Sequence, residues 1–231
     1  MIKRVVLGDG LLGSELVRQT GWRSISRHKD GIDFTKKHTY EHLLVEYDEV
    51  INCIAHTDTY DENRDIHWDV NYAGVSELVD ICNKHDIKLI HISTDYMYTN
   101  SKKNSSETDI PSPCNTWYGY TKLLGDAHVQ LKSDNYLVAR CTHKPSPFPY
   151  SKAYTNLIGN FDYVNKIAEL IVLLIKSDGV GVYNIGTELK SMFDLARITR
   201  PDVDPINELY NDQMPTDVSM DITKLKGKLK L

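Results

Sequence analysis

The sequence has little cysteine: four residues in 231, and no two of them form a Cys-x-x-Cys pair. Cys53, Cys82, Cys114 and Cys141 stand far apart, so neither a zinc cage nor a disulfide framework is predicted. Buried, reduced thiols are the expected state of such cysteines. We therefore predict no metal site.

Long apolar runs and clusters of basic residues are also scarce. No stretch approaches the roughly 18 to 20 apolar residues of a membrane-spanning helix, and the N-terminal apolar run is too short for a signal peptide. The formal net charge of −5 disfavours nonspecific nucleic-acid binding, which depends on clustered Lys and Arg. We expect a cytoplasmic protein with neither a nucleic-acid nor a membrane partner, and a solvated tail at residues 224–230.

Glycine is concentrated in one informative place. Residues 2–7 form an apolar run typical of a strand, the segment Gly8-Asp9-Gly10-Leu11-Leu12-Gly13 follows, and residues 14–20 continue with helical spacing. A strand, a glycine turn and a helix in this order predict a dinucleotide site, with the pyrophosphate at the helix N-terminus. The alternative is a turn that is rich in glycine for backbone reasons alone.

Strands and helices alternate along the rest of the chain. Strands are predicted at 22–28, 49–55, 87–93, 136–140 and 181–185, and helices at 65–85, 118–131, 163–175 and 192–198. This alternation predicts an α/β fold, a Rossmann-like doubly wound parallel sheet with a small C-terminal substrate-binding portion. We divide the chain into an NAD(P)-binding domain at 1–142 and a smaller, partly interwoven substrate-binding portion at 143–231.

Tyr118 and Lys122 are four residues apart in a predicted helix, so their side chains would share one face. A positive charge about 4 Å from the phenol, at an effective dielectric of ~20, would lower the tyrosine pKa by roughly 3 units. Such a pair suits proton transfer to a carbonyl. The alternative is an exposed aromatic residue and a solvated lysine.

Several segments together carry a family resemblance. They are residues 52–57 (NCIAHT), 70–74 (VNYAG), 91–98 (HISTDYMY) and 117–126 (WYGYTKLLGD), and the glycine turn precedes them. With them the chain resembles the extended short-chain dehydrogenase/reductase superfamily, and within it the dTDP-4-dehydrorhamnose reductase branch of nucleotide-sugar reductases. The resemblance covers roughly residues 1–142.

The resemblance implies a catalytic triad of Thr94, Tyr118 and Lys122, in which Tyr118 donates a proton and Lys122 holds the nicotinamide ribose. It also implies a substrate contact set of Thr94, Tyr96 and Arg140. The implied cofactor-binding residues are Gly8, Gly10, Leu11, Leu12, Gly13, Ser26, Arg27, Asp33, Phe34, Ile54, Ala55, His56, Asn71, Tyr118 and Lys122. For His56 a purely structural role is the alternative.

The identity of the cofactor is predicted from the segment 22–28. It carries no Asp or Glu to bind the adenine ribose hydroxyls, and Ser26 and Arg27 stand in that place. An arginine there can bind a 2′-phosphate, so NADPH is favoured, with NADH as the alternative.

The predicted function is NAD(P)H-dependent reduction of the 4-keto group of a nucleotide-activated 4-keto-6-deoxysugar, in deoxysugar biosynthesis. Glu does not follow Asp95, as it would in the related dehydratases, and segment 93–100 lacks the cysteine of the related epimerase-reductases. The chain is shorter than typical members after Arg140, and its first two glycines enclose one residue instead of two. The alternatives are a non-catalytic nucleotide-binding regulatory subunit and a reductase or isomerase of a non-sugar carbonyl. The resemblance also implies a homodimer that packs through helices 65–85 and 118–131.

Overall fold

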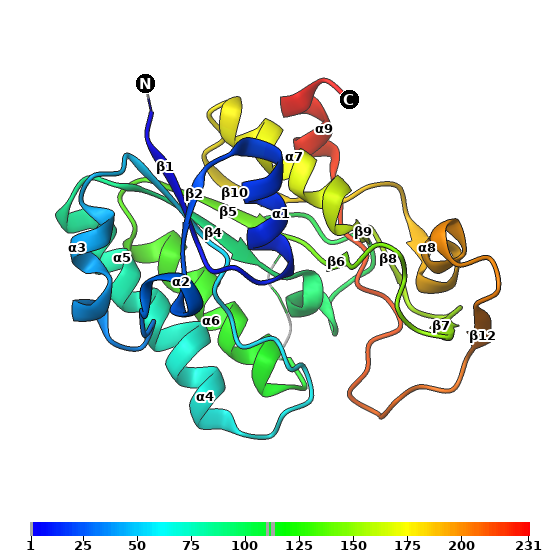
Figure 1. Ribbon diagram of the computed structural model, residues 1–231. Coiled ribbons are helices and arrows are strands. Elements are labelled where there is room, and N and C mark those ends of the chain that lie inside the picture. Colours follow the sequence, from blue (N-terminus) through cyan, green and yellow to red (C-terminus); the bar gives the residue numbers. More distant parts are fainter. Residues whose placement is uncertain (1, 110, 112–113) are drawn as a thin grey trace.

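A six-stranded parallel sheet forms the centre of the molecule. The computed structural model describes residues 2–109, 111 and 114–231 (Figure 1). The strands lie in the order β10-β5-β4-β3-β1-β2, and every neighbouring pair is parallel. They are β1 (Arg4–Leu7), β2 (Arg23–Ile25), β3 (Glu49–Asn52), β4 (Lys88–Ser93), β5 (Tyr136–Arg140) and β10 (Gly181–Asn184). This topology confirms the predicted Rossmann-like fold class.

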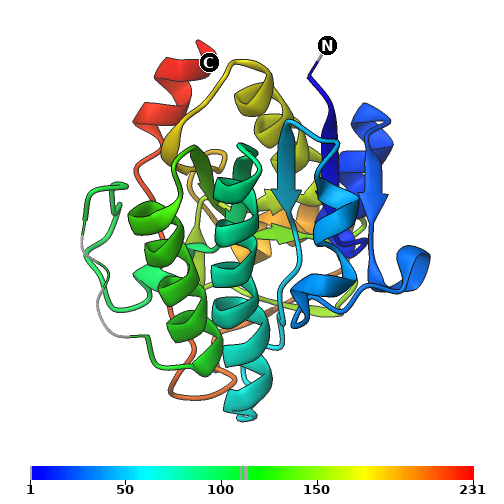
Figure 2. The same cartoon turned by 90° about the vertical axis from the view of Figure 1, so that its left-hand side faces the viewer.

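Helices cover both faces of the sheet, so alternate strand residues are buried on opposite sides. Val6 packs with Leu16 of α1 (Leu11–Thr20) and Ile171 of α7 (Val164–Lys176), whereas Val5 packs in the cluster that contains Leu78 of α5 (Gly74–Lys84). Figure 2 shows α5 and α6 (Trp117–Lys132) side by side across the second face. The helices are α1 (Leu11–Thr20), α2 (Arg27–Asp30), α3 (Glu41–Leu44), α4 (Arg64–Trp68), α5 (Gly74–Lys84), α6 (Trp117–Lys132), α7 (Val164–Lys176), α8 (Met192–Thr199) and α9 (Thr223–Leu229).

Some element boundaries differ from the prediction. The second strand ends at Ile25 instead of residue 28, because the Ser26 hydroxyl accepts a hydrogen bond from Lys29 N and caps the short helix α2. The long helix predicted at 65–85 runs from Arg64 to Lys84, and its middle turn, Asp69–Ala73, is a π-helix. The basic C-terminal segment is not a solvated tail. It forms α9, which packs on α7 through the buried Leu225.

The C-terminal half contributes to two structures. It adds β10, α7 and α9 to the central sheet and its coverings, and it also forms a small lobe with its own core around Phe161, Met192 and Leu195. The lobe and its junction contain α8 and the short strands β6 (His143–Lys144), β7 (Lys152–Tyr154), β8 (Ile158–Gly159), β9 (Asp162–Tyr163), β11 (Lys190–Ser191) and β12 (Asp204–Ile206). Within the described residues, no helix is both long enough and apolar enough to cross a membrane.

Candidate active site

A cavity of about 420 Å³ lies between the carboxyl ends of the central strands and the small lobe. Ligands of doubly wound sheets bind at this edge, where the strand order reverses between β1 and β3. Two-thirds of its lining comes from residues before 142, and the lobe adds an apolar wall of Leu157, Phe161, Met192 and Val218. Nine of the predicted site residues line it: Gly10, Leu11, Leu12, Gly13, Ala55, Thr94, Tyr96, Tyr118 and Lys122.

The glycine turn is shaped for close approach of an anionic group. Gly8 has a φ of +96°, which favours glycine, and a Cβ on Gly13 would lie 2.2 Å from the Gly8 carbonyl oxygen. A Cβ on Gly10 would meet no described atom within 4 Å, so the turn faces open space there. Helix α1 begins at Leu11 with neither a side-chain cap nor an acidic residue in its first turn. Its first N–H groups are therefore available to a phosphate, and a pyrophosphate fits this turn.

The acidic side chain of Asp9, in the glycine turn, lies at the carboxyl end of β2, a position that the sequence did not indicate. The Ser26 hydroxyl donates to Asp9 Oδ2 at 2.9 Å, and His28 Nδ1 lies 3.3 Å from the same oxygen. These contacts, with the Ser26 hydrogen bond as the largest cause, lower the pKa of Asp9. Arg27, the first residue of α2, is exposed. A motif search places Asp9 only inside the glycine turn, so its proximity to β2 could not be predicted from spacing.

Asp33 and Phe34 are two of the eight predicted cofactor residues that are not among the residues lining the cavity. Asp33 accepts hydrogen bonds from the backbone and hydroxyl of Thr35, and its carboxylate pairs with Lys36 at 3.0 Å. Phe34 is buried and stacks on Tyr40 with ring centroids 5.6 Å apart. Asp33 thus serves a local turn, and Phe34 belongs to the core beneath α5.

Ile54, His56 and Asn71 support the cavity from behind. Ile54 packs against Gly8, where a Cβ would lie 3.0 Å from its side chain. The buried Asn71 accepts from His56 N at 2.9 Å and donates to His56 O at 3.0 Å, which fixes the backbone that follows β3. Asn71 stands in the π-helical turn, so this irregular turn orients the amide that holds the loop.

A hydrogen-bonded cluster of His56, Asp61 and His67 lies beside Tyr118, whose ring centroid is 6.4 Å from that of His67. His56 Nε2 is 3.0 Å from Asp61 Oδ2, and His67 Nε2 is 3.0 Å from the Asp61 carbonyl oxygen. A carbonyl oxygen only accepts, so His67 Nε2 carries the proton, and the lone pair of Nδ1 lies 3.5 Å from the Asn71 amide nitrogen. The cluster therefore holds the loop between β3 and α4, and a structural role for His56 fits this arrangement.

The three residues of the implied triad line the same cavity. Thr94 follows β4, and its hydroxyl accepts from Tyr96 N at 3.1 Å, which starts the 3₁₀ turn Asp95–Tyr98. Tyr118 lies in the first turn of α6, which Thr116 caps by accepting from Gly119 N at 3.1 Å. Lys122 lies one turn further along α6, only 3% exposed, and donates from Nζ to the Ile92 carbonyl at 2.7 Å.

The expected acidification of Tyr118 is not found in this arrangement. Burial raises the pKa of Tyr118 to about 12, and the hydrogen bond with Thr94 offsets only part of this rise. Burial also lowers the pKa of Lys122 to about 8. The lysine ammonium contacts the Ile92 carbonyl, and desolvation outweighs any favourable charge at the phenol. Helical spacing predicted a shared face correctly, but it could not predict the partner of the lysine.

Asp95 is a further cavity residue that the sequence interpretation left without a role. It is fully buried, and Thr142 Oγ1 donates to its Oδ1 at 2.5 Å. Burial raises its pKa to about 6, whereas Thr142 and the nearby Lys144 favour the charged form. Lys144 also lines the cavity. The pair gives the lobe side of the cavity one buried acidic side chain and one half-buried basic side chain.

Arg140, expected to contact the substrate, lies outside the cavity. It is 3% exposed and donates to both oxygens of Asp126, Nε to Oδ2 at 3.0 Å and Nη2 to Oδ1 at 2.9 Å. Nη1 also donates to Tyr98 OH at 2.6 Å. The guanidinium is thus a structural link between β5 and α6, because these buried partners use its donors. Lys144, four residues further along the chain, lines the cavity instead.

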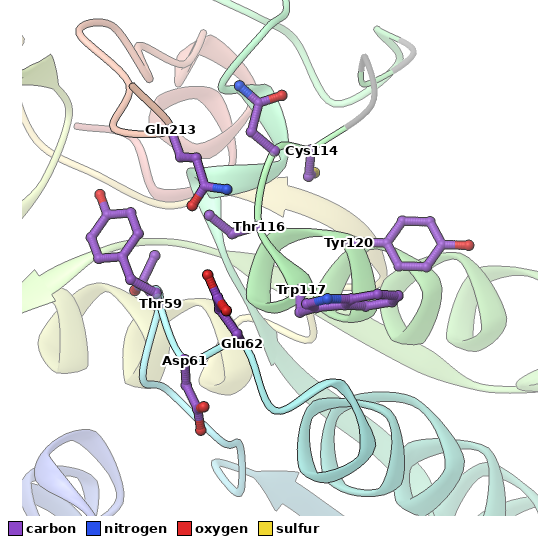
Figure 3. Close-up of a pocket in the computed structure, with 10 residues that line it drawn as sticks. Thr59, Asp61, Glu62, Cys114, Thr116, Trp117, Tyr120 and Gln213 are labelled. Carbon is purple, nitrogen blue, oxygen red and sulfur yellow. The ribbon is translucent and has the colours of Figure 1, made fainter. Parts of the chain in front are cut away.

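A second cavity, of about 510 Å³, lies beyond Tyr60 and Tyr96, whose hydroxyls are 2.7 Å apart. Thr59 lines both cavities. Figure 3 shows Glu62 pointing in among the labelled side chains, whereas the Asp61 carboxylate points away from them. The aromatic rings of Trp117 and Tyr120 form its far wall. This outer cavity is therefore separated from the triad by the Tyr60 and Tyr96 pair.

Comparisons with known proteins agree with this architecture. The family model described as RmlD substrate binding domain matches residues 4–144. A probable low-salt glycan biosynthesis reductase of Haloferax volcanii is 32% identical over 150 residues, which cover 57% of this chain and 50% of that protein. A dTDP-4-dehydrorhamnose reductase of Mycolicibacterium smegmatis is 31% identical over 148 residues, which cover 60% and 45%. The chain thus spans about half the length of these curated relatives.

Solved structures support the fold along the whole chain. A dTDP-4-dehydrorhamnose reductase of Bacillus anthracis, solved in complex with NADP, superposes with a TM-score of 0.84 at 20% identity, over 98% of this chain and 91% of that one. A hypothetical dTDP-4-dehydrorhamnose reductase of Sulfolobus tokodaii gives a TM-score of 0.81 at 23% identity, over 98% and 94%.

Proposed function

The chain belongs to the RmlD substrate binding domain family, and from that premise we propose that it reduces a ketone with a reduced nicotinamide cofactor. The proposed substrate is a nucleotide-activated 4-keto-6-deoxysugar, and the proposed setting is deoxysugar biosynthesis. One observation carries the proposal: Thr94, Tyr118 and Lys122 line the same cavity as the glycine turn. The names of the relatives, a glycan biosynthesis reductase and dTDP-4-dehydrorhamnose reductases, support the sugar substrate.

Tyr118 is the proposed proton donor. With a pKa of about 12 it keeps its proton at neutral pH, so it is always in the form that can donate. Thr94, whose hydroxyl hydrogen-bonds with the phenol, orients the carbonyl oxygen toward Tyr118. When bound, the reduced nicotinamide supplies the hydride to the carbonyl carbon. Hydride and proton together convert the ketone to a hydroxyl.

Lys122 and the glycine turn are the proposed cofactor contacts. The N–H groups at the start of α1 would hold the pyrophosphate, and the Lys122 ammonium would bind the nicotinamide ribose. Arg27 and Ser26 at the end of β2 would meet the adenosine half. We propose NADPH as the cofactor, with NADH as the alternative.

The substrate is proposed to enter from the side of the small lobe. Lys144 can attract a diphosphate, because it is the basic side chain of the lobe-facing wall among the described lining residues. Tyr96 lies on the same wall, and Leu157, Phe161, Met192 and Val218 offer apolar surface to a sugar or base. We propose a cofactor domain at 1–142 and a substrate-binding portion at 143–231 that is partly interwoven with it, and the lobe side of the cavity supports this division.

We also propose a cytoplasmic homodimer that packs through α4, α5 and α6. Large apolar side chains are exposed there: Trp68 on α4 is 42% exposed, and Trp117 and Tyr120 on α6 are 39% and 42% exposed. Burying such side chains against a second copy would remove this surface from water. Light scattering on the purified chain tests the oligomeric state, and a monomer at micromolar concentration would contradict the proposed homodimer.

The activity is tested with a panel of substrates. The full chain is incubated with NADPH or NADH and with dTDP-, UDP- or GDP-linked 4-keto-6-deoxysugars, and loss of the reduced nicotinamide absorbance is followed. Oxidation with at least one sugar nucleotide, abolished in Tyr118→Phe, is the expected result. Cofactor binding without oxidation would instead support the non-catalytic alternative, and oxidation only with simple ketones would support a non-sugar carbonyl.

A further inference from the structure

Asp9, the acidic residue of the glycine turn, lies where the proposed reductase would distinguish NADPH from NADH. Asp9 lies between Gly8, with its φ of +96°, and Gly10, and the Ser14 hydroxyl fixes its backbone by donating to the Asp9 carbonyl at 2.7 Å. Its side chain reaches away from α1 and accepts from the Ser26 hydroxyl at 2.9 Å. The carboxylate therefore closes the gap between the turn and the end of β2.

The direction of a bound dinucleotide follows from the sheet. Tyr118 and Lys122 face the cavity on the β4 side, and β2 lies on the opposite side of β1 in the order β4-β3-β1-β2. With the pyrophosphate at the start of α1 and the nicotinamide at Lys122, the adenosine half must extend toward the end of β2. Its ribose then meets Ser26 and the carboxylate that Ser26 holds.

Asp9 brings a carboxylate to the position where NAD-binding Rossmann folds bind the ribose hydroxyls, although it follows β1 in the chain and not β2. In NAD-binding Rossmann folds an acidic residue at the end of β2 accepts hydrogen bonds from the ribose hydroxyls. Here no acidic residue occupies 22–28, but Asp9 brings a carboxylate to the same point from the turn after β1. That carboxylate can accept a hydrogen bond from a 2′-hydroxyl and repels a 2′-phosphate.

Basic groups surround the carboxylate and oppose its effect. His28 Nδ1 lies 3.3 Å from Asp9 Oδ2, and the exposed Arg27 precedes His28 on α2. Lys29 is directed elsewhere and donates to the Ser24 hydroxyl at 2.6 Å. Arg27 and His28 can bind a 2′-phosphate, so the two sets of charges act in opposite directions on NADPH.

We propose that Asp9 is a specificity-determining residue, which weakens the binding of NADPH relative to NADH and thereby allows both cofactors to be used. The inference rests on the proposed function, because it requires a nicotinamide dinucleotide in the cavity. Substitution Asp9→Asn keeps an acceptor for the Ser26 hydroxyl and removes only the charge. It should raise the ratio of NADPH affinity to NADH affinity by about tenfold or more.

The test measures dissociation constants for NADH and NADPH, by fluorescence titration of the full chain without any sugar nucleotide. Asp9→Asn is compared with Glu15→Gln, which removes one negative charge on α1 beside Arg18 and should leave the ratio unchanged. Arg27→Gln should lower the affinity for NADPH alone. Thermal unfolding of each variant, with no shift beyond that of Glu15→Gln, establishes that Asp9→Asn keeps the fold.

Each outcome decides the matter. A ratio that rises in Asp9→Asn and stays constant in Glu15→Gln supports the proposal. An unchanged ratio, or equal losses for the two cofactors, overturns it and leaves the proposed reductase intact. Failure of the native chain to bind either cofactor would overturn the proposed function, and the inference with it.

Discussion

The central sheet and the small lobe hold their sides of the cavity by different means. The sheet side rests on five parallel strand pairs, whose carboxyl ends present the glycine turn, Thr94 and Cys141 at one edge. The lobe has strands of two or three residues, and single side chains position them. Asn160 accepts from Met220 N at 2.8 Å and donates to Thr187 O at 2.9 Å, and Tyr163 OH donates to Leu195 O at 2.9 Å.

This difference suggests that the sheet side positions the residues proposed for the chemical step, whereas the lobe sets the affinity for the substrate. A parallel sheet fixes the relative position of residues that follow its strands, so backbone hydrogen bonds set the positions of the glycine turn and Thr94, and helix α6 places Tyr118 beside them. The lobe depends on a few side-chain contacts, and its wall can change in shape without disturbing the sheet. We therefore expect substitutions on the sheet side to abolish turnover or folding, and substitutions in the lobe wall to alter substrate affinity.

The largest effect is expected from Tyr118→Phe. Loss of the proposed proton donor should lower kcat by roughly 10² to 10⁴, while the dissociation constant for the reduced cofactor changes little. Steady-state kinetics and a binding titration measure the two quantities. Tyr120→Phe, on the exposed face of the same helix, is the matched control. Retention of more than a tenth of the native kcat would contradict the assigned role.

The second prediction compares a buried ion pair of each region. Arg140→Met leaves the fully buried Asp126 without its partner and should cost roughly 3 to 5 kcal/mol of unfolding free energy. Lys190→Met breaks a pair with Asp162 at 3.2 Å in the lobe, where both side chains keep some exposure, and should cost only about 1 to 2 kcal/mol. Urea unfolding measures both. Equal losses would remove the distinction between the regions.

The third prediction concerns the pH dependence of activity, which we assign to Lys122 on the sheet side of the cavity. Because burial lowers the pKa of Lys122 to about 8, its ammonium is charged below that pH and neutral above it. The ratio kcat/KM, which reports the free enzyme, should therefore fall as pH rises through about 8. Tyr118, with a pKa of about 12, keeps its proton throughout. If kcat/KM began to fall only near pH 10, the fall would have to be assigned to a group other than Lys122.

The smallest effect is expected in the lobe wall. Leu157→Ala removes apolar surface from the cavity and should raise KM for the sugar nucleotide several-fold, about 1 kcal/mol, with kcat nearly unchanged. Leu189→Ala, at a lobe position that is 57% exposed, serves as the control. A large fall in kcat would mean that the lobe takes part in the chemical step.

Local patterns made much of the molecule predictable. The glycine turn between β1 and α1, the alternation of strands and helices, and the shared face of Tyr118 and Lys122 all depend on spacing within one or two elements. The end of β2 was harder to predict, because a three-residue strand followed by a capped four-residue helix gives too short a pattern. The strands of the lobe were harder still to predict, since two or three residues are too few to show an alternating pattern.

The order of the elements, the parallel sheet and the residues at its carboxyl edge are encoded in strand and turn patterns that repeat locally along the chain. Three further properties arise from the folding of distant segments against one another. This folding brought Asp9 to Ser26, it paired Arg140 with Asp126 and left Lys144 to face the cavity, and it raised the pKa of Tyr118. Each depends on burial and on contacts between residues distant in the chain, which spacing does not encode.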